Sequence, residues 1–180
     1  MRKRKVIAYM ALSLDGFIAR GNGDIEWLSM ANRPGEDYGY NAFYDEIDTV
    51  LIGRNTYEKI MSLGIDFPHK KRKCYVISTT LSGVVPDSDI EHYSEDLHKL
   101  IEILKNEQND KHILVDGGAK LINELAKLEL IDEWIISIVP MILGSGLRLF
   151  EERCPEQRLK LITSKSYDSG LVQLTYSRTH

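Results

Sequence analysis

Hydrophobic residues recur along the chain in two patterns that alternate with each other. Short apolar runs, such as residues 6–12 and 48–52, are typical of strands buried on both faces of a sheet. Segments such as 95–107 instead place leucine and isoleucine at helical spacing, and Ser94 is the residue expected to cap that helix. The expected strands are 6–12, 48–52, 73–78, 112–115, 134–139, 158–166 and 171–177, and the expected helices are 38–46, 55–63, 95–107 and 118–128.

The order of these elements predicts an α/β fold. Strands and helices alternate up to residue 128, and strands with short connections follow. This order indicates a mostly parallel central sheet that ends in antiparallel C-terminal strands. The long loop over residues 13–36 also carries aromatic and aliphatic residues, so we expect it to be ordered. No repeat or linker interrupts the chain, and residues 1–180 are expected to form a single domain.

Composition narrows the possible function classes. The chain is 43% hydrophobic and 28% charged with a net charge of −4, which argues against general nucleic-acid binding. No apolar run approaches the roughly 18 residues of a membrane span, and the basic residues 1–5 are not followed by a signal-peptide core. Cys74 and Cys154 are isolated and the five histidines show no ligand spacing, so we expect a reduced, cytoplasmic protein without metal.

Two junctions between a strand and a helix carry the clearest functional signal. The first runs through Gly53 and Arg54 after the strand 48–52, and the second runs through Gly117 and Gly118 after the strand 112–115. A helix that starts at such a turn leaves its first N–H groups unpaired, and they form a site for a phosphate. Arg54 and Lys120 would add positive charge. Two such junctions in one chain favour a ligand with two phosphate positions, such as a dinucleotide.

Polar residues also follow several expected strands, at the sheet edge where ligands bind in open α/β folds. Asp15, Ser78, Thr79 and Asp116 lie at these strand ends. Each has a structural alternative: Asp15 could stabilise its own turn, and Asp116 could favour the helix dipole. The sequence Gly144-Ser145-Gly146, taken alone, is interpreted as a tight turn.

The chain resembles the dihydrofolate reductase superfamily, and within it the reductase (RibD C-terminal) domain of bacterial riboflavin biosynthesis and its stand-alone relatives. The matching segments, in order, are MALSLDGFIA at 10–19 with Trp27, LIGRNTYE at 51–58, CYVIST at 74–79, ILVDGGAKL at 113–121 and PMILGSGLRLF at 140–150. The resemblance implies a three-layer α/β/α fold of the dihydrofolate-reductase type. It also implies NADPH as cofactor.

Roles follow from the resemblance residue by residue. It implies that NADPH is bound by Ala11, Ile18, Gly53, Arg54, Asn55, Thr56, Ser78, Thr79, Gly117, Gly118, Ala119 and Leu121. Trp27 matches the active-site tryptophan of the superfamily, Asp116 would contact the sugar of the substrate, and Asp15 or a water would deliver a proton. Trp134 and the rest of 134–139 are expected in the core or in a dimer interface, and the assembly expected is a homodimer.

The expected activity is an NADPH-dependent reduction of a pyrimidine-like or pteridine-like compound, with 5-amino-6-(5-phosphoribosylamino)uracil as the specific candidate. Two alternatives stay open. A true dihydrofolate reductase is disfavoured by Asp116, which stands where that enzyme has a glycine, although Asp37 could match its folate-binding carboxylate or be a surface residue. The other alternative is a nucleotide-binding module without catalytic activity.

Overall fold

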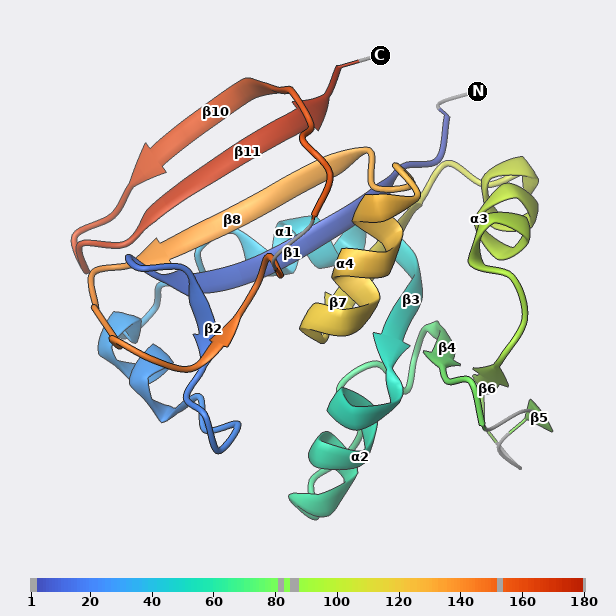
Figure 1. Ribbon diagram of the computed structural model, residues 1–180, viewed down its shortest axis with the longest axis horizontal. Coiled ribbons are helices and arrows are strands. Elements are labelled where there is room, and N and C mark those ends of the chain that lie inside the picture. Colours follow the sequence, from blue (N-terminus) through green and yellow to red (C-terminus); the bar gives the residue numbers. More distant parts are fainter. Residues whose placement is uncertain (1–2, 81–82, 85–87, 152–153, 180) are drawn as a thin grey trace.

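The computed structural model describes residues 3–80, 83–84, 88–151 and 154–179, and a nine-stranded sheet runs through it (Figure 1). The strands pair in the order β10-β11-β8-β1-β7-β3-β4-β6-β5. Their bounds are β1 Val6–Ser13, β3 Ile47–Gly53, β4 Lys73–Ile77, β5 Gly83–Val84, β6 Ile90–Tyr93, β7 His112–Gly117, β8 Glu133–Val139, β10 Leu159–Ser166 and β11 Val172–Arg178. β2 (Phe17–Ala19) and β9 (Leu147–Arg148) form a separate antiparallel pair.

Most of the large sheet is parallel, as the sequence predicts. β8, β1, β7, β3, β4 and β6 all run in one direction, whereas β11 pairs antiparallel with β8 and β10 antiparallel with β11. From β1 the chain passes to β3 and continues outward on that side of the sheet. It later returns to β7, which lies between β1 and β3, and then crosses to β8 on the other side of β1. The connections therefore change direction between β1 and β7, and such a point opens a crevice at the carboxyl ends of the strands.

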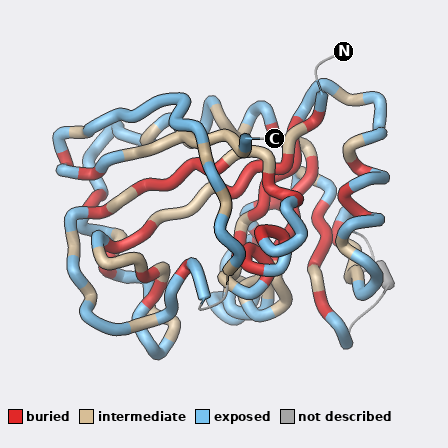
Figure 2. Tube along the Cα trace, turned by 45° about the horizontal axis from the view of Figure 1, so that its top comes forward, coloured by how far each residue is buried: buried red, intermediate tan, exposed pale blue. Residues whose placement is uncertain are grey.

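Helices cover both faces of the sheet, and the alternation of side chains along each strand separates two cores. On β7, Ile113 and Val115 face the cluster under the helices α3 (Leu97–Asn106) and α4 (Ala119–Lys127). Leu114 faces the other cluster, with residues of α1 (Tyr40–Asp45) and α2 (Arg54–Ser62). Figure 2 shows that the buried positions concentrate in the central strands and α4, while the β10–β11 hairpin is much more exposed. The predicted fold class is confirmed.

The expected elements differ from the observed ones in a few places. The 95–107 helix starts at Leu97, and its cap is Asp96, whose carboxylate accepts a hydrogen bond from the N–H of Lys99 at 2.9 Å. The expectation of Ser94 as the cap was therefore wrong, because the chain is still leaving β6 at that point. β5 and β6 were not predicted. The long loop is ordered and contains β2 and a 3-10 helix, η1 (Glu26–Ala31). No helix in the described part of the chain is both long and apolar enough to cross a membrane.

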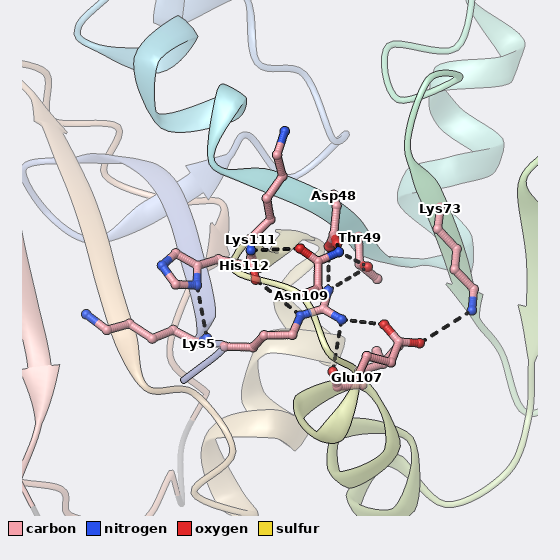
Figure 3. Close-up of polar contacts among 10 residues, drawn as sticks. Lys5, Asp48, Thr49, Lys73, Glu107, Asn109, Lys111 and His112 are labelled. Carbon is pink, nitrogen blue, oxygen red and sulfur yellow. Dashed lines mark hydrogen bonds and ion pairs between the residues drawn. The ribbon is translucent and has the colours of Figure 1, made fainter. Parts of the chain in front are cut away.

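A buried arginine ties the start of β1 to two other parts of the fold. The guanidinium of Arg4, which is 2% exposed, forms ion pairs with Asp48 at the start of β3 and Glu107 after α3. It also donates to the carbonyl of Leu104 at 3.0 Å and the hydroxyl of Thr49 at 3.0 Å. In Figure 3, Asp48 and Thr49 lie on one side of this network, and Glu107 lies on another, toward Lys73. This network lies at the amino ends of the strands, away from the crevice.

Replacing Arg4 tests how much this network stabilises the fold. Arg4→Ala leaves two carboxylates without their buried partner, and the free energy of unfolding is expected to fall by about 3 kcal/mol. Lys5→Ala is the matched control, because Lys5 pairs with Glu133 at the surface and such pairs contribute about 1 kcal/mol or less. Urea denaturation measures both. Equal midpoints for the two variants would contradict this account of Arg4.

Candidate active site

The two strand–helix junctions predicted from the sequence lie against each other at the carboxyl edge of the sheet. A Cβ atom added to Gly53 would lie 3.3 Å from the backbone nitrogen of Gly118 and 3.5 Å from the carbonyl of Gly117. A Cβ added to Gly118 would lie 2.8 Å from Oγ1 of Thr56. Side chains at these two positions would push the junctions apart. The glycines therefore allow β3–α2 and β7–α4 to form one continuous surface.

The helices that start at these junctions keep their N-terminal N–H groups available. In the described part of the chain, no side chain caps α2, whose cap residue is Gly53, or α4, whose cap residue is Gly118. By contrast, the carboxylate of Asp96 fills the same position on α3. Uncapped N–H groups and the positive ends of two helix dipoles favour an anion between α2 and α4.

Arg54 links this surface to the end of the neighbouring strand β4. Its guanidinium donates to the hydroxyl of Thr80 at 2.8 Å and lies 3.3 Å from a carboxylate oxygen of Glu58. The hydroxyl of Ser78 lies 3.3 Å from that of Thr80. Three strand ends therefore bring a guanidinium, two hydroxyls and two helix N-termini to one edge. Of the predicted set, Asn55 and Thr79 are exposed beside them, Ala119 is half-buried and Leu121 is buried in the core below.

β1 pairs with β7 on the side opposite to β3, and β2 packs against β1. Ala11 on β1 and Ile18 on β2 are half-buried, as expected of positions that flank a ligand. The side chain of Met10 lies closest to the second junction, with its Cε 3.8 Å from the place of a Cβ on Gly117. The sequence did not single out Met10, because an apolar residue in an apolar strand carries no separate signal.

The contacts of Asp15 support its turn interpretation. Its carboxylate accepts hydrogen bonds from the hydroxyl of Ser13 at 2.6 Å, the N–H of Leu143 at 3.1 Å and the N–H of Gly144 at 2.7 Å. These donors, the Ser13 hydroxyl above all, lower the pKa of Asp15 to about 2. The residue therefore stays ionised at neutral pH and ties the β1–β2 turn to the loop that follows β8.

Two other predicted residues lie beyond β1, on the β8 side of the crevice. Trp27 is buried against Val139 and Leu171, and its indole N–H has no hydrogen-bond partner among the described residues. Trp27 is only 3% exposed, so this N–H is buried. The exposed Asp37 accepts hydrogen bonds from the N–H of Gly39 at 2.8 Å and that of Asn41 at 3.1 Å, at the start of α1. These contacts support the interpretation of Asp37 as a surface residue.

Asp116 lies at a bulge in β7, directly before the second junction. Leu51 of β3 pairs with Val115 but the next residue, Ile52, pairs with Gly117, so Asp116 is the extra residue. A bulge of this kind re-aims a side chain. The carboxylate points to the α1 side of the sheet, where one of its oxygens lies 3.1 Å from Nε2 of His69.

The surroundings of Asp116 are aromatic and largely buried. Tyr44 lies 2.9 Å from the other ring nitrogen of His69. Burial and, next, the charge of Asp116 raise the pKa of Tyr40, and the same two causes raise the pKa of Cys74 to about 12. The sequence interpretation assigned all five histidines to surface or packing roles. His69 is buried and both of its ring nitrogens have polar partners. No sequence signal reveals these contacts, because the partners come from α1 and β7 rather than from neighbouring positions.

Two open grooves on the surface lie away from the junctions. One groove of about 550 Å³ lies between the loop at Arg33 and the β10–β11 turn at Tyr167, at the carboxyl edge but beyond β8. The other, of about 540 Å³, contains Lys71 and Asp89 at the amino ends of β4 and β6. We place the candidate site at the junctions because the glycines, the helix N-termini and Arg54 converge there, whereas volume alone specifies no chemistry.

The chain is similar to a known protein family and to several known proteins. The model of the RibD C-terminal domain family matches residues 4–173. The chain is 39% identical to the uncharacterized protein YwjB of Bacillus subtilis over 176 residues, which covers 98% of this chain and 99% of YwjB. It is 31% identical to the uncharacterized protein YyaP of the same organism, which covers 98% of this chain and 96% of YyaP.

Solved structures of similar shape include a riboflavin biosynthesis protein, so named provisionally, from Shewanella sp. PV-4. It has a TM-score of 0.86 and 31% identity, over 98% of this chain and 99% of that one. A pyrimidine reductase-like protein from Corynebacterium diphtheriae has a TM-score of 0.68 and 15% identity, with 98% and 92% covered. RibD of Acinetobacter baumannii has a TM-score of 0.70 and 18% identity, with 99% and 59% covered. The last two likenesses show the fold alone.

The contact between the junctions can be tested by Gly118→Ala. The new methyl group would overlap Oγ1 of Thr56, and the free energy of unfolding is expected to fall by about 1–3 kcal/mol, as in other overpacked sites. Thr56→Ala removes that oxygen. Gly118→Ala should therefore lower the free energy of unfolding less in the Thr56→Ala background than in the wild type. Urea denaturation of the four proteins measures this coupling. Strictly additive effects would show that the two residues are not in contact.

Proposed function

Because the chain belongs to the RibD C-terminal domain family, we propose that it is an NADPH-dependent reductase of a pyrimidine-like substrate. The observation that carries the proposal is the pair of close-packed glycine junctions, with Arg54 beside them, at the carboxyl edge of the sheet. This arrangement has the charge and the backbone donors that a dinucleotide requires.

The chain's own residues fit NADPH at this edge. We assign the pyrophosphate to the N-termini of α2 and α4, where a glycine begins each helix and no described side chain occupies the N–H groups. We assign the 2′-phosphate to the polar side chains at the end of β4, which are those of Arg54, Ser78 and Thr80. Ala11, Ile18 and Met10 would hold the nicotinamide between β1 and β7. The bound cofactor supplies the hydride, and these residues orient it and exclude water.

The substrate would lie beside the cofactor, on the Asp116 side of the crevice. An ionised carboxylate accepts hydrogen bonds, so it suits the hydroxyl groups of a sugar. The specific activity that we propose is the reduction of 5-amino-6-(5-phosphoribosylamino)uracil. The similar structure named for riboflavin biosynthesis supports this choice.

Reduction also requires a proton at the reacting atom. Asp15 is a poor source, because three donors hold its carboxylate ionised and its pKa is lowered to about 2. We therefore assign proton delivery to a water molecule. The same contacts give Asp15 a structural role in the wall of the crevice.

The alternative activities receive less support. A dihydrofolate reductase would need a carboxylate for the pteridine, and the candidate for it, Asp37, is exposed and bonded to the backbone of α1. A nucleotide-binding module without catalytic activity would not need an aimed carboxylate at the bulge. Asp116 and its partner His69 therefore favour an enzyme.

We further propose that residues 1–180 act as one domain in a homodimer. β10 is an outer strand of the large sheet, and it exposes about half of the surface of Leu161 and of Ile162. An unpaired strand edge with exposed aliphatic side chains favours association with another chain. Trp134, expected in the core or in the dimer interface, is 3% exposed and belongs to the core. The two free thiols, Cys74 and Cys154, support the cytoplasm as the compartment.

Arg54→Ala tests the assignment of the cofactor site. Loss of a charge-assisted contact to a phosphate should weaken NADPH binding by about 1.5–3 kcal/mol in titration calorimetry. Because Arg54 lies beside Thr80 at the β4 end, the loss should be smaller for NADH, which lacks the 2′-phosphate. Lys59→Ala, on the same helix but outside the junction, is the control and should bind like the wild type. Unchanged NADPH affinity of Arg54→Ala would rule out this assignment.

Asp116→Asn tests the substrate side independently. NADPH affinity should be retained, because the glycine backbone of the junction is untouched, while kcat/KM for the ribosylaminopyrimidine should fall as a charged acceptor becomes neutral. If Asp116 only favoured the helix dipole, turnover would be normal and stability would fall by about 0.3–1 kcal/mol. Steady-state kinetics and thermal unfolding of the same variant separate these results. Loss of cofactor binding by a stable variant would contradict both readings.

A further inference from the structure

His69 occupies a place that packing alone does not explain. It lies in the loop between α2 and β4, yet it is only 3% exposed. Its ring packs edge-on against Phe67 at 5.4 Å and lies 5.6 Å from the ring of Tyr44. Phe67 is itself part of the core. The imidazole is therefore held in one orientation from two sides.

Both nitrogens of this ring have polar partners, and the partners determine where its proton lies. An ionised carboxylate only accepts hydrogen bonds, so Nε2 must donate its hydrogen to Asp116 at 3.1 Å. A neutral imidazole with hydrogen on Nε2 has a lone pair on Nδ1. The hydroxyl of Tyr44 lies 2.9 Å from Nδ1, where it can donate to that lone pair. With this tautomer, the hydrogen bonds run in one direction, from Tyr44 through His69 to Asp116.

These hydrogen bonds make the two carboxylate oxygens of Asp116 differ in their partners. Oδ2 accepts from His69, whereas Oδ1 has no hydrogen-bond partner among the described residues. The side chain is 27% exposed and lies at the bulge directly before Gly117. A carboxylate on a bulge could rotate about its last bond, and the bond to His69 prevents that rotation.

We propose that His69 is a positioning residue of the active site: it fixes the carboxylate of Asp116 so that Oδ1 faces a hydrogen-bond donor of the substrate, and Tyr44 selects the required tautomer. This inference rests on the proposed reductase function. It also narrows the substrate class, because the group at Oδ1 must be a hydroxyl or an N–H. A phosphate would be repelled from this position and must bind elsewhere.

The kinetics of His69 variants test its role. His69→Phe keeps a ring of similar size but removes both hydrogen bonds, so KM for the ribosylaminopyrimidine should rise about 10-fold with NADPH affinity unchanged. His69→Gln can still donate a hydrogen bond to Asp116 and should recover most of that loss. Tyr44→Phe removes the hydroxyl next to Nδ1, and Tyr57→Phe is its matched control, because the ring of Tyr57 packs on Phe67 whereas that of Tyr44 packs on His69.

A double-mutant cycle shows whether His69 acts through Asp116. If it does, adding His69→Phe to Asp116→Asn should change KM less than about twofold, since the oriented charge is already lost. Independent effects of the two substitutions would overturn the proposal. So would a His69→Gln variant as impaired as His69→Phe.

Nitrogen-15 NMR of the histidine ring separates a failure of this inference from a failure of the reductase assignment. The wild-type protein should show His69 with its hydrogen on Nε2, and Tyr44→Phe should reduce the preference for that tautomer. A wild-type His69 with its hydrogen on Nδ1 would overturn the proposal whether or not the protein turns over a pyrimidine. Absence of NADPH binding in a protein with the expected tautomer would instead count against the proposed function.

Discussion

The close contact between the β3–α2 and β7–α4 junctions is the constraint on which the candidate site depends. Gly53 and Gly118 permit it, because a methyl group at either position would meet the opposite junction at 3.3 Å or less. The contact aligns the N-termini of two helices at one edge of the sheet, and the resulting positive potential favours an anionic ligand. It also brings Asp116 next to that ligand position, since the bulge directly precedes Gly117.

The buried Arg4 network and the candidate site lie at opposite ends of the strands of the same sheet. At the amino ends of the strands, Arg4 is buried and its ion pairs and hydrogen bonds join β1, β3 and α3. At the carboxyl ends, the glycines and the uncapped helices leave backbone groups free, and Asp116 retains an oxygen without a partner among the described residues. Such a division is expected in an open α/β sheet, where ligands bind outside the carboxyl ends of the strands.

The sequence predicted the fold and the junctions well because both depend on local patterns. Continuous apolar runs mark the buried parallel strands, and a glycine at the end of such a run marks the start of α2 or α4. The family resemblance added the dihydrofolate-reductase type of the fold and led to the proposal of NADPH as cofactor. The apolar runs and their terminal glycines each span about ten neighbouring residues, so they can be recognised without knowledge of tertiary contacts.

What the sequence missed depends on contacts between distant segments. The cap of α3 moved from Ser94 to Asp96, because the pairing of β6 with β4 extends the strand to Tyr93. His69 carries no local signal, and its role appears only when α1 and β7 come together around it. The sequence left two roles open for Asp15, a turn residue or a proton donor. The hydrogen bonds that it accepts from the backbone of Leu143 and Gly144 support the turn role, and they are visible only in the fold.

A crystal structure of the protein with NADP⁺ tests the central claim most directly. The account predicts the pyrophosphate against the backbone of Gly53–Arg54 and Gly117–Gly118, with the nicotinamide between β1 and β7 and its ring beside Asp116. A cofactor found in the groove between Arg33 and Tyr167, or at the amino ends of the strands near Lys71, would contradict it.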